Sequence, residues 1–358
     1  MRVAVLGAAG LIGRAVVCDL KESREISQIT ELDRERSGRG GADVHAVDAE
    51  DRQQLALALD GIDLLLNAAS YRVNLAAMDA ALAAGSHYID LGGLYHVTAW
   101  QLGLREAFER AGLLAVLGCG AGPGKTNVMA AWAAEELDDV HVVRCASAGH
   151  DADPPPGVSL PYALATLLDE MREAPMVLRN GTPVALEPLA AGGEIDFPAP
   201  VGRRASLYTL HSEVLTLGGS LGAAEVDFRL ALAPRTETTL RQIARGASAP
   251  PIVPPSAETF SAQVVELTGT RDGAGRRVRV TALTKPHAAW GIGGGVVSTA
   301  SVAAAVARLM ARGELRDPTG HEPLTGVHPP ERALHHSTLF PELEARGCEF
   351  SITTSEVS

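Results

Sequence analysis

The first third of the chain alternates short apolar runs with longer segments in which apolar residues recur every three or four positions. Near-continuous apolar runs are typical of parallel strands covered on both faces, and the longer spacing is typical of the covering helices. We expect strands at 3–6, 27–33, 44–48, 62–67, 87–91 and 113–117. We expect helices at 11–20, 51–59, 73–84 and 97–110. Together they predict an α/β fold built on a doubly wound parallel sheet.

The pattern changes after about residue 125, where hairpin signals appear. Asn180-Gly181 divides the segment 177–186, and residues 272–275 separate strands expected at 263–270 and 277–283. Hairpins pair strands antiparallel, so we expect a second, α+β domain. Further helices are expected at 127–137, 161–171 and 296–311, and strands at 140–146 and 225–231. The predicted organisation is 1–125, 126–290, and a helix and tail over 291–345 that return to the first domain.

A glycine-rich turn joins the first predicted strand to the first predicted helix. Glycines in this position let the backbone approach a pyrophosphate, and the helix N-terminus supplies N–H groups and a partial positive charge. This is the context of a Rossmann-type dinucleotide site, although a glycine turn without a ligand is the alternative interpretation. The residues expected to contact the cofactor here are Gly7, Ala9, Gly10, Leu11, Ile12 and Gly13.

Asp33 ends the second predicted strand, 20 residues beyond Gly13. A carboxylate at this place hydrogen-bonds the adenosine ribose hydroxyls and repels a 2′-phosphate, which favours NAD over NADP. Arg34, followed by Arg36 and Arg39, offers the alternative of pairing with a 2′-phosphate. A turn carboxylate without a ligand is the other interpretation of Asp33.

Ligands of doubly wound sheets bind at the carboxyl ends of the strands. The residues that follow the third and fourth strands are therefore expected to contact the cofactor as well. They are Asp48, Ala49, Asn67, Ala68, Ala69, Ser70 and Tyr71.

Composition and charge exclude several classes of function. A chain of 358 residues with 46% hydrophobic and 21% charged residues is typical of a globular protein with two domains. The net charge of −12 disfavours binding to nucleic acid or to anionic membranes. Four scattered cysteines predict neither a disulfide framework nor a zinc site. No leader and no apolar run of membrane-spanning length is evident, so we expect a cytoplasmic protein.

The segment 119–126 is similar to the phosphate-binding loop of nucleotide hydrolases but lacks its spacing. Cys119 stands where that loop needs its first glycine. The flexible backbone at Gly120 and the helix that follows still suit an anion or a substrate. Lys125 would place a positive charge there; a solvated lysine at a helix start is the alternative.

Several segments occur together in an order that resembles the saccharopine dehydrogenase family, and most of all its L-lysine 6-dehydrogenase branch. They are the turn Gly7–Gly13, HYIDLGG at 87–93, GCGAGPGKTNVMA at 118–130, PYALATLLDE at 161–170, EIDFPAPVG at 194–202, YTLHSEVLTL at 208–217 and GVHPPE at 326–331. The resemblance implies a homodimeric, nicotinamide-dependent enzyme that acts at a C–N bond of an amino acid. In the lysine branch the ε-amine is oxidised to an imine. Lys125 departs from the pattern, because the family carries an apolar residue there; a cation would favour a substrate carboxylate over an ε-ammonium.

Hydride can leave a carbon that bears nitrogen only when the nitrogen is uncharged, so the reaction needs a general base. His211 is the candidate, with Asp90 at a strand end as a group that orients the amine or the base. Tyr162 and Glu213 are candidate contacts for the substrate amine and carboxylate. A packed or capping role is the alternative for His211 and Asp90. The other histidines, His335 and His336 among them, show no metal-ligand spacing.

Three functions remain open. The first is an NAD-dependent amino-acid dehydrogenase of the lysine 6-dehydrogenase type. The second is a saccharopine- or opine-type reductase that joins an amine to an oxo acid. The third is an NAD-binding sensor without catalytic activity.

Overall fold

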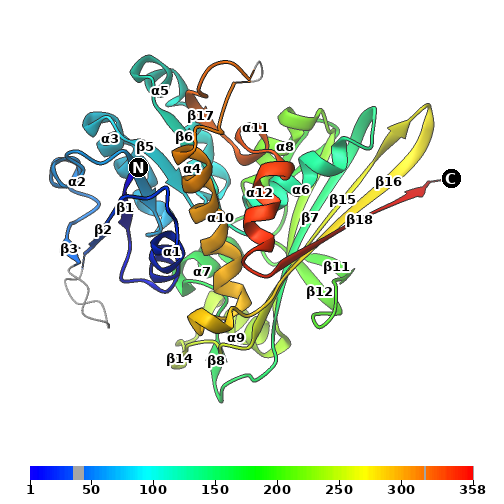
Figure 1. The fold of residues 1–358 in the computed structure, drawn as a ribbon. Helices are drawn as coiled ribbons and strands as arrows, with labels where there is room; N and C mark the ends of the chain where they lie inside the picture. Colours follow the sequence, from blue (N-terminus) through cyan, green and yellow to red (C-terminus); the bar gives the residue numbers. More distant parts are fainter. Residues whose placement is uncertain (35–43, 318–319, 358) are drawn as a thin grey trace. The chain divides into compact units, whose positions relative to one another are not determined.

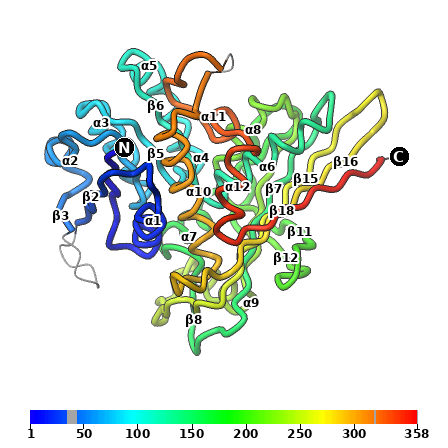
Figure 2. The backbone as a smooth tube through the Cα atoms, viewed as in Figure 1, coloured from blue at the N-terminus to red at the C-terminus, as the bar shows by residue number. Residues whose placement is uncertain are grey.

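The computed structural model describes residues 1–34, 44–317 and 320–357, and the chain divides into two compact units. The first unit is Met1–Lys125 with Thr299–Leu343, and the second is Thr126–Ser298 with Glu344–Ser358. Figure 1 labels the elements of both units, and Figure 2 traces the backbone in the same view. Each unit therefore combines segments that are far apart in the sequence.

A seven-stranded parallel sheet forms the centre of the first unit. Its strands are β1 (Arg2–Leu6), β2 (Gln28–Asp33), β3 (His45–Ala46), β4 (Leu64–Asn67), β5 (His87–Asp90), β6 (Leu114–Val116) and β17 (Gly326–His328). They lie in the order β17-β6-β5-β4-β1-β2-β3, and every neighbouring pair is parallel. The order reverses between β1 and β4, which is the point where doubly wound sheets bind ligands. The predicted α/β fold with a doubly wound sheet is confirmed.

Helices connect these strands, and the apolar faces of the helices pack on the sheet. They are α1 (Leu11–Lys21), α2 (Arg52–Ala58), α3 (Asn74–Ala84), α4 (Leu94–Leu102) and α5 (Arg105–Ala111). The core that they share with the sheet includes the buried side chains of Leu32, Leu65 and Phe108. The single helix predicted at 97–110 is wrong: α4 ends before Gly103, and α5 begins after Leu104.

The seventh strand of this sheet comes from the far end of the sequence. β17 pairs with β6 over three residues, with Gly326 opposite Leu114 and His328 opposite Val116. In Figure 1, where colour follows residue number, this late strand is orange and lies beside the cyan β6. The sequence pattern does not predict this strand, because three residues are too few to show a period.

The second unit is built on a mixed nine-stranded sheet. Its strands are β7 (Asp139–Asp151), β9 (Met176–Arg179), β10 (Thr182–Ala185), β11 (Ala191–Asp196), β12 (Arg203–Tyr208), β13 (Glu225–Ala231), β15 (Thr259–Arg271), β16 (Ala274–Thr284) and β18 (Cys348–Glu356). The main path runs β10-β9-β13-β7-β15-β16-β18, and β12 joins β11 to β13. A separate pair is formed by β8 (Val158–Ser159) and β14 (Ile252–Val253). Most pairs are antiparallel, as the hairpin signals predicted.

Both predicted hairpins are present. Asn180-Gly181 joins β9 to β10, and Asp272-Gly273 joins β15 to β16. All four turn residues have positive φ, from 49° to 75°, which is the geometry of a two-residue turn that matches the strand twist. The second hairpin is longer than predicted, and Figure 2 shows it in yellow with the red β18 alongside.

The helices of the second unit include α6 (Lys125–Ala134), α7 (Leu164–Arg172), α8 (Glu213–Leu221) and α9 (Pro234–Ala244). The prediction that a helix begins at Pro161 is wrong, because α7 starts at Leu164 after Ala163, whose backbone is not helical. Short 3-10 turns are η1 (Tyr71–Val73) in the first unit and η2 (Ala288–Trp290) in the second.

Three helices lie towards the end of the chain: α10 (Gly294–Ala311), α11 (Pro330–Ala333) and α12 (His336–Glu344). By length and composition α10 is apolar enough to cross a membrane, contrary to the expectation that no run reaches that length. However, 83% of its 18 residues are buried in the protein, as in a core helix. Its Arg308 pairs with Asp19 of α1 at 2.8 Å, which ties residues 299–311 to the first unit.

Candidate functional site

The glycine turn after β1 is shaped by close backbone contacts. A Cβ added at Gly13 would lie 2.1 Å from the Gly7 carbonyl oxygen, so only glycine allows α1 to start this near the strand. Gly7 has φ +80°, and a Cβ there would lie 2.7 Å from the Ala69 nitrogen. Gly10 precedes α1 without a side-chain cap. The turn thus presents backbone rather than side chains at the start of a helix, the arrangement that suits a pyrophosphate.

The remaining residues predicted in this turn lie around the same backbone. Leu11 is exposed at 43%, an unusual fraction for a large apolar side chain, and Ile12 is half-buried. The Ala9 N–H donates to the Asp33 Oδ2 at 2.9 Å. Asp33, at the end of β2, is thereby fixed against the turn, where the sequence analysis expected a ribose-binding carboxylate.

The loop after β4 lies against the glycine turn. The Ala68 N–H donates to the Leu6 carbonyl at 2.8 Å. The side-chain oxygen of Asn67 accepts from the Ala69 N–H at 3.0 Å. This loop and the turn therefore meet at the carboxyl ends of β4 and β1, the predicted place for the cofactor.

Four other predicted cofactor residues lie nearer the surface. Ser70 caps η1 by accepting the Arg72 N–H at 3.4 Å, and the Arg72 guanidinium lies 5.1 Å from the centre of the Tyr71 ring. Asp48 is exposed and accepts the Glu50 N–H at 3.0 Å, so it shapes the turn after β3 that includes the half-buried Ala49.

Arg34 is exposed directly after β2. Arg36 and Arg39, named with it as alternatives for binding a 2′-phosphate, lie outside the described residues.

Asp90 is buried at the end of β5, and its carboxylate accepts hydrogen bonds from N–H groups of the first unit. It accepts N–H groups of Gly118 at 2.7 Å and Gly92 at 2.9 Å, and side-chain N–H groups of Gln101 at 2.6 Å and Asn74 at 3.1 Å. Burial raises the pKa of the Asp90 carboxyl, and the hydrogen bonds from Gly118, Gln101 and Gly92 oppose that rise. The bonds order the loops after β5 and β6; that Asp90 also orients a substrate stays a prediction.

The glycine-rich loop 118–125 closes tightly on itself. The Lys125 N–H donates to the Gly120 carbonyl at 2.9 Å, and the Gly120 N–H donates to the Pro123 carbonyl at 2.9 Å. Lys125 is only 1% exposed, so the alternative of a solvated lysine is wrong. A buried ammonium at this place is consistent with the predicted anion or substrate cradle.

His211 belongs to a buried group of acidic side chains in the second unit. Its Nδ1 lies 3.2 Å from the Glu213 Oε2, and its Nε2 lies 3.6 Å from the Glu170 Oε2. The ring stacks on Phe228 of β13 with centroids 3.6 Å apart. His211, Glu213 and Glu170 are each at most 6% exposed. Two carboxylates therefore flank one imidazole away from water.

Two hydroxyl groups extend this cluster. The Tyr162 hydroxyl donates to the Glu170 Oε2 at 2.5 Å, and the Thr126 hydroxyl donates to the Glu213 Oε1 at 2.9 Å. The resulting order is Tyr162–Glu170–His211–Glu213–Thr126. The structure thus brings together three residues predicted from sequence, His211, Glu213 and Tyr162, and adds two.

The two added residues had weak sequence signals. Glu170 lies in the segment PYALATLLDE, which was used for the family resemblance only, and Thr126 lies in the glycine-rich loop segment. An acidic residue on the buried face of α7 is the signal that would have found Glu170, because an unpaired buried carboxylate is costly.

Charge determines the protonation of His211. Burial by itself lowers the pKa of the ring, but the charges of Glu213 and then Glu170 raise it to about 10. The ring is therefore an imidazolium at neutral pH. As a base, His211 must first lose this proton, which confines the predicted role to alkaline conditions.

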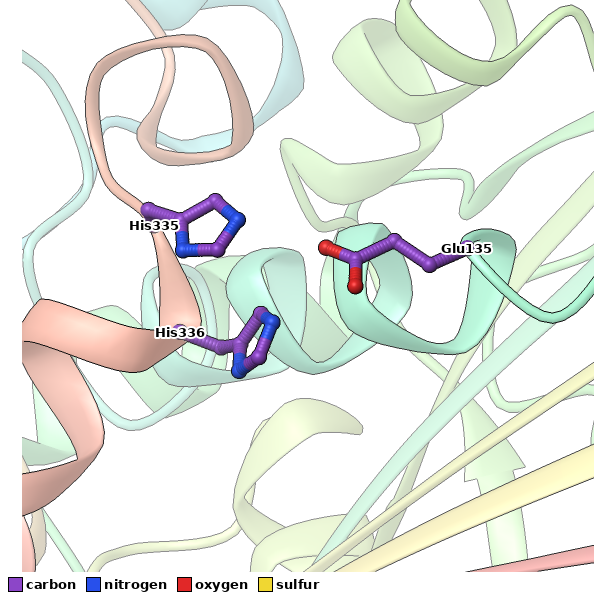
Figure 3. A group of neighbouring side chains, drawn as sticks. All are labelled: Glu135, His335 and His336. Atoms are coloured by element: carbon purple, nitrogen blue, oxygen red, sulfur yellow. The ribbon is translucent and has the colours of Figure 1, made fainter.

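His335 and His336 lie side by side in the first unit, with ring centroids 4.4 Å apart (Figure 3). The Nδ1 of His335 lies 2.7 Å from the Ser337 hydroxyl. Glu135, drawn in the same figure, belongs to the second unit. Two histidines alone leave the coordination of a metal incomplete, so we assign no metal site to them.

Comparisons with known proteins find a similar sequence over part of the chain and a similar fold over nearly all of it. Residues 3–116 match the family model described as the saccharopine dehydrogenase NADP binding domain. The solved structure of saccharopine dehydrogenase (L-Glu forming) from Saccharomyces cerevisiae superposes with a TM-score of 0.72 over 99% of both chains, at 12% identity. That likeness shows a shared fold.

Two curated relatives are more similar in sequence over shorter regions. A carboxyaminopropylagmatine dehydrogenase from Synechocystis sp. is 29% identical over 167 residues, which cover 44% of this chain and 41% of that protein. A carboxynorspermidine synthase from Vibrio alginolyticus is 33% identical over 109 residues, which cover 27% and 26%. The matched regions span less than half the length of either relative.

Proposed function

We propose that the whole protein is an NAD(P)-dependent dehydrogenase acting at a C–N bond, as the match of residues 3–116 to the saccharopine dehydrogenase NADP binding domain supports. Its substrate carries an amine and a carboxylate. The observation that carries the proposal is the buried acid–base cluster around His211, in a unit separate from the dinucleotide-binding sheet. A nicotinamide sensor without catalysis has no need of such a cluster.

The residues of the first unit suit the cofactor. Gly7 and Gly13 leave room for a pyrophosphate at the start of α1, and Asp33 is positioned for the adenosine ribose. A bound nicotinamide would accept or donate the hydride at the carbon attached to nitrogen. The protein's own task is to hold the substrate, exclude water, and supply or remove one proton at nitrogen.

We favour a reductase that joins an amine to a carbonyl compound. The two relatives are named for carboxylated derivatives of amines, and an imidazolium at neutral pH is suited to donate a proton to nitrogen. The buried Lys125 supports a substrate carboxylate. L-Lysine ε-deamination is the second candidate; it is favoured by the segment LHSEV, which resembles the lysine branch of the family.

An absorbance assay of the reduced nicotinamide separates these candidates. Agmatine, norspermidine and L-lysine are each tested alone with NAD or NADP, and each with an oxo acid or a carboxylated aldehyde and NADH or NADPH. We expect oxidation of the reduced cofactor only when the amine and the carbonyl compound are both present. Cofactor reduction by lysine alone would establish the second candidate. Tight cofactor binding without turnover in any combination would support the third function, an NAD-binding sensor without catalytic activity.

For the cofactor we propose a preference for NAD, although the matching family model is described as NADP binding. The support is Asp33, whose carboxylate is fixed beside the glycine turn and would repel a 2′-phosphate. The exposed Arg34 is the group that would favour NADP instead. Dissociation constants for NADH and NADPH, measured by fluorescence, test the preference.

We also propose that the protein is a homodimer, as the family resemblance implies, and that it acts in the cytoplasm. A mass near twice 37.3 kDa in light scattering would support the dimer. A monomer at micromolar concentration would contradict it.

A further inference from the structure

The cluster around His211 is a continuous chain of polar groups rather than a single ion pair. Tyr162, Glu170, His211, Glu213 and Thr126 follow one another through contacts of 2.5, 3.6, 3.2 and 2.9 Å. Four of the five side chains are buried, and Tyr162 is the member that is partly exposed. This series of contacts therefore has one buried end, at Thr126, and one end at Tyr162, the residue that is partly exposed.

We propose that Tyr162 and Glu170 connect the His211 imidazole to the substrate nitrogen as a proton relay, with Glu213 holding the other side of the ring. This inference rests on the proposed function and deepens it. It assigns Tyr162 as the catalytic residue that meets the substrate, and Glu170 and Glu213 as positioning residues.

The geometry on either side of His211 determines the direction of transfer. Nδ1 is engaged by Glu213, which begins α8 and which Thr126 also bonds. Nε2 is buried, has no hydrogen-bond partner among the described residues, and faces Glu170 at ion-pair distance. Phe228 of β13 covers the ring with an apolar face. The mobile proton is therefore the one on Nε2, and Glu170 is the group that receives it.

Each proton in the relay is accounted for. When an amine product must be protonated, the Tyr162 hydroxyl gives its proton to nitrogen and takes another through Glu170 from His211 Nε2. His211 goes from imidazolium to imidazole, and the amine becomes an ammonium. In the opposite direction a substrate ammonium loses a proton by the reverse path, which needs a neutral His211. Burial and Glu170 raise the pKa of Tyr162 well above its usual value, so both transfers at the phenol are concerted.

The relay predicts opposite pH profiles for the two directions. The charged groups that act on His211 are Glu213 and Glu170, from α8 and α7, and β13 contributes the uncharged Phe228. C–N bond formation needs the imidazolium and should decline above pH about 10. C–N bond oxidation needs the neutral ring and should rise with pH until about 10.

The first test measures His211 directly, without any substrate. The full-length protein is labelled with ¹⁵N-histidine, and His211→Gln identifies the signal. We expect the ring to titrate near pH 10 in the wild type and at least about one unit lower in Glu170→Gln, because one of two flanking charges is lost. Glu173→Gln, an exposed glutamate just beyond α7, is the control and should leave the midpoint unchanged. A midpoint that Glu170→Gln does not move would overturn the relay.

The second test uses turnover with the amine and carbonyl compound. Tyr162→Phe should lower kcat at least about tenfold and abolish its pH dependence, while the dissociation constant for reduced cofactor stays within twofold. Tyr208→Phe, on β12, is the matched control. Unchanged kcat and pH profile in Tyr162→Phe would remove tyrosine from the relay. If the wild type turns over no substrate, the proposed function fails, and the NMR titration alone decides the coupling of Glu170 to His211.

Discussion

At the scale of single residues, both the fold and the candidate cofactor site require that Gly13 has no Cβ atom. Gly13→Ala would place a Cβ 2.1 Å from the Gly7 carbonyl oxygen, and backbone cannot give way as a side chain can. We expect an unfolding free energy lower by about 1–3 kcal/mol and cofactor affinity at least about tenfold weaker. Gly10→Ala, whose Cβ would be 3.2 Å from the same oxygen, is the milder control. Equal losses in the two variants, measured by denaturant unfolding and fluorescence titration, would contradict this account of the turn.

Asp33 carries the proposed preference for NAD. Asp33→Ala removes a charged acceptor from the ribose and the repulsion of a 2′-phosphate, so we expect weaker NADH binding, by roughly tenfold, and unchanged or tighter NADPH binding. Glu31→Ala is the control, since Glu31 lies on the same strand and pairs with Lys21 at 3.1 Å. If the ratio of the two dissociation constants does not change, Asp33 is not the discriminating residue. Weaker NADPH binding in Arg34→Ala would then identify Arg34.

His211 links stability to pH with a definite sign. Its pKa is raised from 6.5 to about 10 in the folded state, so the folded state binds the proton more tightly than the unfolded state. The stabilisation is complete below pH 6.5 and is lost as the pH rises through about 10. We expect the difference in unfolding free energy between wild type and His211→Gln to fall across this range, by at most about 1.4 kcal/mol per pH unit. Parallel stability curves for the two proteins would show that the ring is not charged when folded.

At the scale of elements, α1, α10 and α12 meet at a buried ion pair. Arg308 bonds Asp19 at 2.8 Å and Glu342 at 2.6 Å, and its side chain is 4% exposed. Arg308→Met leaves Asp19 buried without this charge and should cost about 3–5 kcal/mol. Asp19→Asn combined with Arg308→Met should recover part of that loss. Arg312→Met, at a more exposed arginine that also pairs with Glu342, should cost about 0–1 kcal/mol. A small effect of Arg308→Met in denaturant unfolding would show that the pair adds little.

The elements that sequence patterns predicted are those with a local cause. Asn180-Gly181 and Asp272-Gly273 specify their turns through positive φ, and the apolar runs of the first sheet show their burial directly. β17 and β18 could not be predicted in the same way. β17 has three residues, and β18 alternates polar residues that are mostly exposed. Both are strands because a distant partner, β6 or β16, offers an open edge.

The residues of the candidate site likewise divide into those with a local sequence signal and those that meet only after folding. Gly7, Gly13 and Asp33 were found from spacing, because the phosphate and ribose sites are built within one stretch of chain. The His211 cluster draws on α6, α7, α8 and the segment before α7, so its members are neighbours only after folding. His211, Glu213 and Tyr162 were found through the family resemblance. Glu170 was missed. The burial of the Lys125 side chain could not be predicted from its position in the sequence.

At the scale of the whole molecule, one unit carries a sheet of the dinucleotide-binding type and the other carries a buried acid–base cluster. The fold alone does not determine the reaction, because related folds support many chemistries. What restricts the reaction is the combination of a cradle suited to a nicotinamide dinucleotide and a proton held on a buried imidazole. Both are expected in an enzyme that transfers a hydride at a C–N bond and a proton at its nitrogen.

The measurement that tests this claim most directly is isotope transfer from reduced cofactor. The protein is incubated with NADH deuterated at C4 of the nicotinamide, an amine such as agmatine or norspermidine, and a carbonyl compound with a carboxylate. Mass spectrometry of the product then locates the label. We expect one deuterium on the carbon that forms the new C–N bond. Saturating cofactor binding with no deuterium in any product, across the amines tested and with NADPH as well, would contradict the claim.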